Sequence, residues 1–100
     1  MKRLRLDAAA RAELLHETKY YEATRSGNGR KFRLAVNEAF ERIKRSPDAG
    51  KPDEENCRRL RIKGYPFSAV FREEKIEIVV YAIRTDARVP GYWTSRTGDG

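Results

Sequence analysis

The chain has 100 residues, which is enough for one small domain with a single hydrophobic core. Its net charge of +7 favours acidic partners, namely nucleic acid, an anionic membrane or an acidic protein. A single cysteine excludes an internal disulfide, and no apolar run is long enough to span a membrane, so we expect a soluble cytoplasmic protein. We expect residues 1–96 to form one domain and residues 97–100 to fray as a polar tail.

The first half of the chain has the pattern of a short strand followed by two helices. Residues 2–6 alternate charged residues with leucines, and this period of two predicts a half-buried strand. Asp7 provides an N-cap for a first helix, which should end near residues 26–29, where two glycines and an asparagine suit left-handed backbone. Apolar residues spaced by three and four predict a second helix over about residues 30–45, antiparallel to the first.

The second half of the chain changes to the period of two that is typical of strands. We interpret residues 46–56 as a polar connection, and its acidic run at 53–55 as a solvated loop and not as a metal site. Three strands are then expected over residues 58–63, 67–72 and 76–83. The last of these is apolar on both faces apart from Glu77, which predicts a central strand covered on both sides.

These elements predict an α+β fold with an N-terminal strand, an α-helical hairpin and a three-stranded antiparallel meander. The hairpin should cover one face of the sheet, and the other face should be curved and partly uncovered. Alternation along the first strand of the meander places Arg59, Arg61 and Lys63 together on that second face. These cations could pair with the acids at 53–55 or with Glu77, or they could form a contact surface for another macromolecule.

Three segments of the sequence resemble the RelE/ParE superfamily of toxins. The first joins Lys19-Tyr20-Tyr21-Glu22 to Gly27-Asn28-Gly29-Arg30-Lys31-Phe32. The second runs from Arg58-Arg59-Leu60-Arg61 through Gly64-Tyr65-Pro66-Phe67 to Phe71-Arg72. The third, Arg88-Val89-Pro90-Gly91-Tyr92-Trp93-Thr94-Ser95-Arg96, is similar to the R-x-P-x-Y-W-x-x-R ending of the ParE branch. The likeness covers roughly residues 3–96.

The resemblance implies a toxin of a type II toxin–antitoxin system, and the ParE branch implies an inhibitor of DNA gyrase. A cognate antitoxin, usually a ribbon-helix-helix DNA-binding dimer, should neutralise it. Two alternatives stay open: a RelE-type mRNA interferase that acts on the ribosome, and a non-toxic protein-binding module. The ribonuclease would use Arg61, Arg72, Arg84 and Tyr92, but the sequence offers no evident proton acceptor. Thr85 stands where many members of the ParE branch carry histidine, which also favours gyrase inhibition.

Two sets of binding residues follow from this interpretation. For the toxic target, whether gyrase or the ribosome and its mRNA, we expect contacts from Arg59, Arg61, Lys63, Arg84, Arg88, Tyr92, Trp93 and Arg96. For the antitoxin, we expect contacts from Leu14, Tyr21, Phe32, Val36, Phe40 and Arg61. Trp93 could instead cap the core where the tail folds back, and Tyr92 could serve either role.

The remaining reactive side chains are expected to be structural. His16, the only histidine, should lie on the surface in the middle of the first helix. Cys57 has no histidine near it in the sequence and should be a small core or edge residue. An acid such as Glu77 beside strand-borne cations is typical of a cross-strand pair. The chain contains no phosphate-binding loop, zinc motif or nucleophile motif, so we expect no cofactor, no metal and no membrane partner.

Overall fold

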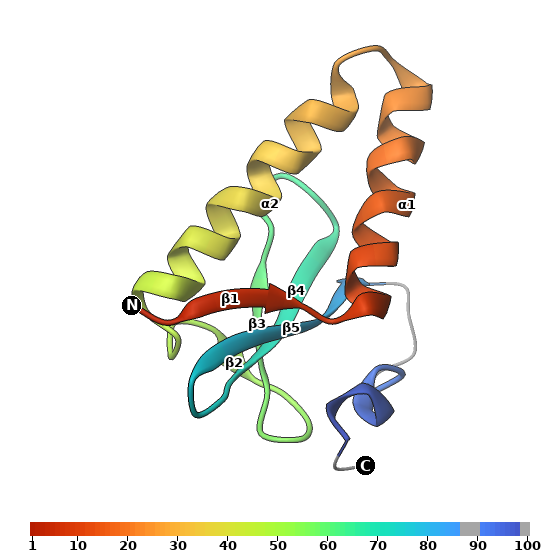
Figure 1. The fold of residues 1–100 in the computed structure, drawn as a ribbon. Helices are drawn as coiled ribbons and strands as arrows, with labels where there is room; N and C mark the ends of the chain where they lie inside the picture. The colour runs from red at the N-terminus through yellow and green to blue at the C-terminus, as the bar shows by residue number, and fades with distance from the viewer. Residues whose placement is uncertain (87–90, 99–100) are drawn as a thin grey trace.

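A strand, a helical hairpin and then a run of strands follow one another along the chain (Figure 1). The structure, a computed structural model, describes residues 1–86 and 91–98. Its elements are β1 (Arg3–Leu6), α1 (Ala8–Thr24), α2 (Asn28–Arg45), β2 (Lys51–Pro52), β3 (Arg58–Arg61), β4 (Phe67–Glu73), β5 (Glu77–Thr85) and the short 3-10 helix η1 (Thr94–Thr97). This order confirms the predicted α+β fold, including the antiparallel meander β3–β4–β5.

The strands of the described part form a single sheet in the order β1-β5-β4-β3-β2. β1 runs parallel to β5, and the other neighbours are antiparallel. β2 is the strand that the sequence pattern did not predict, because Lys51 and Pro52 pair with Arg59 and Arg58 inside the stretch interpreted as a polar connection. Two residues are too few to show a period of two, so this short strand leaves no signal in the sequence.

The junction between the two helices differs from the prediction. α1 begins after Asp7, whose carboxylate accepts a hydrogen bond from the backbone nitrogen of Ala9 at 3.0 Å, as the N-cap pattern predicted. α2 begins at Asn28, two residues before the predicted start. Asn28 and Gly29 are already helical, and of the glycines and asparagine in this turn only Gly27 takes left-handed backbone, with a φ of 93°.

Glu22 explains the early start of α2. Its carboxylate accepts hydrogen bonds from the backbone nitrogens of Gly27 and Gly29, at 3.1 and 3.0 Å, and so satisfies N–H groups that lack partners at a helix start. Gly29 is buried where the helices meet, and a Cβ atom there would lie 2.9 Å from the carbonyl oxygen of Thr18. Close helix packing therefore requires the glycine at this position.

The main core lies between the hairpin and one face of the sheet. It contains Ala10, Leu14, Phe32, Val36, Ala39, Phe40, Ile43, Leu60, Ile62, Phe67, Ala69, Phe71, Ile78, Val80 and Ile83. These residues come from the apolar stripes of both helices and from alternate positions of the strands, as the periodicity predicted. In the described part of the chain, no helix has the length and apolar content needed to cross a bilayer.

A second, smaller cluster covers part of the opposite sheet face. Its buried residues are Cys57, Val70, Val79, Tyr81, Ala82 and Trp93. Trp93 belongs to residues 91–98, called here the C-terminal segment, so this segment folds back onto the sheet (Figure 1). β5 has a strand on each side and is buried on both faces, which agrees with the strand predicted to be covered on both sides.

Candidate partner-binding surfaces

A groove of about 630 Å³ is lined by residues of β1, α1 and α2. Figure 1 shows that β1 lies near the ends of the two helices that are remote from their connecting turn. We call this groove the hairpin groove. Its apolar lining comes from all three elements and consists of Leu4, Leu6, Leu14, Leu15 and Phe40. β1 forms one edge of the sheet, so an extended or helical segment of a partner could reach this lining without displacing a strand.

The polar lining of the hairpin groove is mainly cationic. It consists of Arg11, Arg33, Asn37, Glu41 and Lys44. Glu41, the only acid among them, forms an ion pair with Lys44 at 3.0 Å, whereas Arg11 and Arg33 have no ion pair with any described residue. An apolar groove with a cationic rim suits an amphipathic segment that carries acidic residues.

The structure separates the residues that the sequence predicted for antitoxin contact. Leu14 and Phe40 line the hairpin groove. Phe32 and Val36 are fully buried in the main core, so their side chains are not on the surface. Tyr21 packs on Phe32, with ring centroids 4.9 Å apart. Arg61 lies on β3, on the opposite sheet face, and does not line this groove.

Three apolar lining residues of the hairpin groove, Leu4, Leu6 and Leu15, were absent from that predicted set, as were all of its polar lining residues. The alternation of residues 2–6 did place the two β1 leucines on one face, but their distance from α2 could not be known. Leu15 is 50% exposed and lies beside the buried stripe of α1. The helical period of a sequence identifies the residues at the centre of an apolar stripe, which are buried. A surface groove is lined by residues at the margin of that stripe, such as Leu15, which the period does not single out.

A second groove, of about 620 Å³, lies along β3 and is lined mainly by cationic side chains. This basic groove is lined by Arg42, Lys51, Arg59, Arg61, Lys63 and Arg84, together with Asp86 and the small residues Ala49, Gly50, Gly64 and Ser68, and by Leu60. Cross-strand register explains the gathering, because Arg61 pairs with Ser68 and Ser68 pairs with Arg84 across the sheet. The structure thus brings together four of the predicted target-binding cations, three from the strands and Lys63 from the turn after β3.

Two acids, Asp53 and Asp86, form ion pairs with three of the four arginines that line the basic groove. The carboxylate of Asp53 lies 3.5 Å from the guanidinium of Arg59 and 3.3 Å from that of Arg84. The carboxylate of Asp86 lies 3.2 Å from the guanidinium of Arg61. Asp53 is therefore a structural acid and not a solvated one as its loop was interpreted, since its side chain is 9% exposed. Among the described residues Lys63 has no ion-pair partner, which leaves an exposed charge in the turn after β3.

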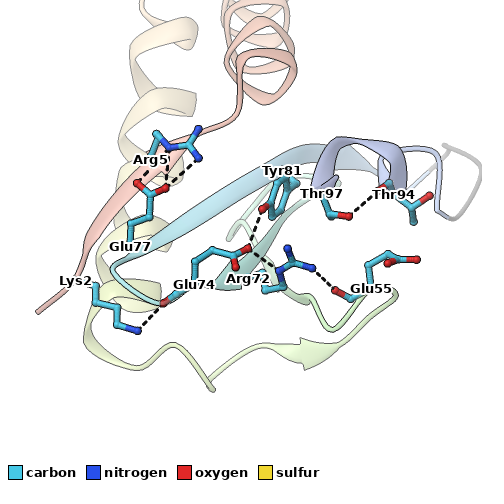
Figure 2. A network of polar contacts seen from close by, with 9 residues as sticks. All are labelled: Lys2, Arg5, Glu55, Arg72, Glu74, Glu77, Tyr81, Thr94 and Thr97. Carbon is cyan, nitrogen blue, oxygen red and sulfur yellow. Dashed lines mark hydrogen bonds and ion pairs between the residues drawn. The ribbon is translucent and has the colours of Figure 1, made fainter. Parts of the chain in front are cut away.

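Arg72, one of the candidate ribonuclease residues, is engaged outside the basic groove (Figure 2). Its guanidinium donates to a carboxylate oxygen of Glu74 at 2.6 Å and to the carbonyl oxygen of Glu55 at 3.0 Å, and it lies over the ring of Tyr81. The Tyr81 hydroxyl also donates to Glu74, at 2.9 Å. Burial and this hydrogen bond raise the pKa of Tyr81 to about 12, so the network joins β4 and β5 through a neutral phenol.

The other reactive side chains lie where the sequence predicted. Glu77 forms an ion pair with Arg5 of β1 at 3.1 Å (Figure 2). His16 is exposed on α1. Cys57 is buried, and burial raises the pKa of its thiol to about 11, so it is not poised as a nucleophile. The described residues contain no group of three or more His, Cys, Asp or Glu side chains that could hold a metal ion.

The C-terminal segment is held against the molecule by residues that the sequence interpretation assigned to target contact. Trp93 is fully buried in the second cluster, so the structure corrects its place: it caps the sheet and is not on the surface. The Tyr92 hydroxyl donates to Glu13 at 2.8 Å, and Arg96 forms an ion pair with Glu13 at 3.0 Å. Arg88 lies outside the described residues. Glu13 itself was missed, because nothing in a helix pattern shows which distant segment an acid will meet.

Comparison with known proteins identifies the family. A family model described as the ParE toxin of the type II toxin-antitoxin system, parDE, matches residues 4–90. Among solved structures, a chain described as the chromosomal ParDE TA system from P. aeruginosa is 28% identical, with a TM-score of 0.66, over 85% of this chain and 96% of that one. No curated protein matches the sequence. The family match spans most of the sequence, and the chain therefore belongs to the ParE toxin family of type II toxin–antitoxin systems.

Proposed function

We propose that this chain is a toxin that inhibits DNA gyrase by binding it, and that a cognate antitoxin neutralises the toxin. The observation that carries the proposal is the match to the ParE toxin family over residues 4–90. The geometry supports binding over bond cleavage, because the four candidate ribonuclease residues do not converge. Arg61 and Arg84 line the basic groove, whereas Arg72 is bonded to Glu74 and Tyr92 to Glu13.

In the described part of the chain, the lining of the basic groove also offers few groups that could transfer a proton during RNA cleavage. Its lining among the described residues includes no histidine, and its one acid, Asp86, is paired with Arg61. Cations without a base and an acid can grip a polyanion or an acidic protein surface but do not complete a cleavage site. This supports a toxin that acts by holding its target.

The hairpin groove is the proposed antitoxin site. We expect the antitoxin to be a ribbon-helix-helix DNA-binding dimer with an additional segment that orders on the toxin. Apolar side chains of that segment would cover Leu6, Leu15 and Phe40, and its acids would face Arg11 and Arg33. Added salt should weaken such a complex only in part, because apolar contacts are not screened. Complete release of the antitoxin by salt would contradict the apolar contribution.

A supercoiling assay with purified gyrase tests the toxin activity. The wild-type chain should inhibit supercoiling, and Arg61→Ala combined with Lys63→Ala should weaken inhibition because both cations line the basic groove. Arg3→Ala is the matched control, since Arg3 is an exposed strand cation outside both grooves. Growth arrest by the wild-type chain without any effect on gyrase would rule the proposal out.

A ribosome-dependent mRNA interferase is the second candidate, and the cations of the basic groove are the observation that favours it. This function predicts transcripts that are cut in a translating extract and that stay intact with Arg61→Ala or Arg84→Ala. Uncut transcripts at toxic doses would exclude it. The third possibility, a non-toxic binding module, predicts harmless overexpression in cells that lack the antitoxin.

A further inference from the structure

The carboxylate of Glu13 on α1 accepts hydrogen bonds from three residues in two other parts of the chain, β5 and the C-terminal segment. Both terminal nitrogens of Arg96 donate to it, at 3.0 and 3.1 Å, in a bidentate arrangement. The Tyr92 hydroxyl donates to it at 2.8 Å, and the backbone nitrogen of Ile83 donates to it at 3.1 Å. The side chains of Glu13 and Arg96 are only 16% and 19% exposed, so this charged pair is partly withdrawn from water.

Sheet geometry explains why an acid is needed at this place. β1 pairs with β5 only as far as Leu6 and Val80, so on this side of β5 the residues beyond Val80 have no neighbouring strand in the part of the chain that the structure describes. Backbone groups on that edge still need partners, because buried polar groups without hydrogen bonds are costly. Glu13 accepts from the nitrogen of Ile83, and Arg96 donates to the carbonyl oxygen of Tyr81 at 2.9 Å. The side chains of Glu13 and Arg96 therefore make the hydrogen bonds to β5 that a neighbouring strand would otherwise make.

Trp93 lies between the two residues of the C-terminal segment that reach Glu13. Its indole is fully buried against Cys57, Val70 and Val79 of the second cluster. Its ring nitrogen Nε1 is buried without a hydrogen-bond partner among the described residues. Burial of an unpaired N–H group opposes docking of the ring, so the contacts of Tyr92 and Arg96 with Glu13 must contribute to holding the segment down.

We propose that Glu13 is the positioning residue that fixes the C-terminal segment on the sheet, and that the toxin acts only with this segment docked. The second half of this inference rests on the proposed toxin function, whereas the first half concerns the chain alone. Glu13 acts through Arg96 and Tyr92 and does not itself need to touch the target. One carboxylate thus joins the first helix to a segment 83 residues further along the chain.

Docking can be measured directly because Trp93 is the only tryptophan in the chain. In Glu13→Gln the amide oxygen can still accept from Ile83, but the charge that holds Arg96 is lost. We expect the population with an accessible Trp93 to rise about tenfold, as seen in acrylamide quenching of its fluorescence, since charge-assisted bonds contribute most to such pairs. Glu77→Gln is the matched control, because it removes an exposed ion pair with Arg5 elsewhere on β5.

A double-mutant cycle separates positioning from general destabilisation. Arg96→Met should raise quenching like Glu13→Gln, and the double variant should show no further rise, because both remove the same contact. Tyr92→Phe should give a smaller rise in quenching, because it removes only one hydrogen bond to Glu13. If circular dichroism shows that Glu13→Gln does not fold, Tyr92→Phe is measured in its place. Unchanged quenching in folded Glu13→Gln or, failing that variant, in Tyr92→Phe would overturn the positioning role.

Activity is then measured on variants that remain folded. Gyrase inhibition and growth arrest should both fall in Glu13→Gln and stay unchanged in Glu77→Gln. Full growth arrest by a variant with an accessible Trp93 would overturn the requirement for docking. If the wild-type chain arrests growth without inhibiting gyrase, the proposed target is wrong, but loss of arrest with undocking would still support the inference.

Discussion

Asp53 Oδ2 and Arg84 Nη1 lie 3.3 Å apart and join the loop after β2 to the end of β5, with side chains only 9% and 16% exposed. The same oxygen lies 3.5 Å from Arg59 Nη1. One acid therefore holds two of the cations that line the basic groove, and it fixes their spacing before any partner arrives. A partner that binds these arginines meets an ordered surface and loses less side-chain entropy on binding.

Asp53→Ala should lower the free energy of unfolding by roughly 1–3 kcal/mol, because it leaves two arginines without their acid in a partly buried place. It also removes the acceptor of the backbone nitrogen of Glu54, at 2.8 Å. Urea unfolding of the purified chain measures the change. Asp86→Ala is the matched control, since its ion pair with Arg61 is exposed and should contribute less than about 1 kcal/mol. Equal losses in the two variants would contradict the structural role of Asp53.

The antitoxin should contact Leu15 and not Leu34, although the two leucines are similarly exposed, at 50% and 55%. Leu15 lines the hairpin groove and Leu34 does not. Leu15→Asp should weaken antitoxin binding by about tenfold or more, because burying a leucine contributes roughly 1.5–3 kcal/mol. Isothermal titration calorimetry with the cognate antitoxin measures the affinity. A loss with Leu34→Asp as large as with Leu15→Asp would place the antitoxin elsewhere.

Local patterns predicted the elements that depend on neighbours in the sequence. The alternation of residues 2–6, the cap at Asp7 and the switch to a period of two after residue 57 all correspond to elements in the structure. β2 escaped because two residues carry no period. Gly29 was assigned to left-handed backbone, since the sequence does not show that Glu22 caps the next helix or how closely the helices pack.

The candidate site was only partly accessible from the sequence, for a related reason. Strand alternation was sufficient to predict that Arg59 and Arg61 line one groove, and Lys63 joins them from the turn after β3. The ion pair between Glu13 and Arg96 joins residues 83 positions apart, and no local sequence pattern predicts such a contact. Trp93 illustrates the same limit, because the sequence around it was compatible with both a surface and a core position. The structure shows that Trp93 is buried, because the C-terminal segment packs on the sheet.

Cys57 should resist alkylation in the folded chain at mildly alkaline pH. Burial raises the pKa of its thiol to about 11, against the opposing effect of Arg72, so little of the reactive thiolate forms. The reaction with a thiol reagent should be slow in buffer and fast in urea, where the thiol is exposed and titrates normally. Its rate in buffer should then report the fraction of open molecules. Rapid labelling of the folded chain would show that Cys57 is accessible.

Tyr81 should make the stability of the chain depend on alkaline pH. Burial, followed by its hydrogen bond to Glu74, raises its pKa from 10.0 to about 12 in the folded state. Between these values the folded chain keeps the phenol proton while the unfolded chain loses it, so a rise in pH favours unfolding. The stability linked to this proton is fully present below pH 10 and is lost as the pH rises toward 12.

Tyr81→Phe isolates that contribution. At neutral pH it should cost about 1 kcal/mol for the lost hydrogen bond, and this difference from the wild-type chain should shrink as the pH rises above 10. Urea unfolding of both proteins across this range measures the difference. The raised pKa of Cys57 also lowers the stability of the chain as the pH rises, but this effect is present in both proteins and cancels in the difference. Tyr20→Phe, at an exposed ring, should show no such convergence. A difference that stayed constant with pH would mean that the phenol proton of Tyr81 is not held by the fold.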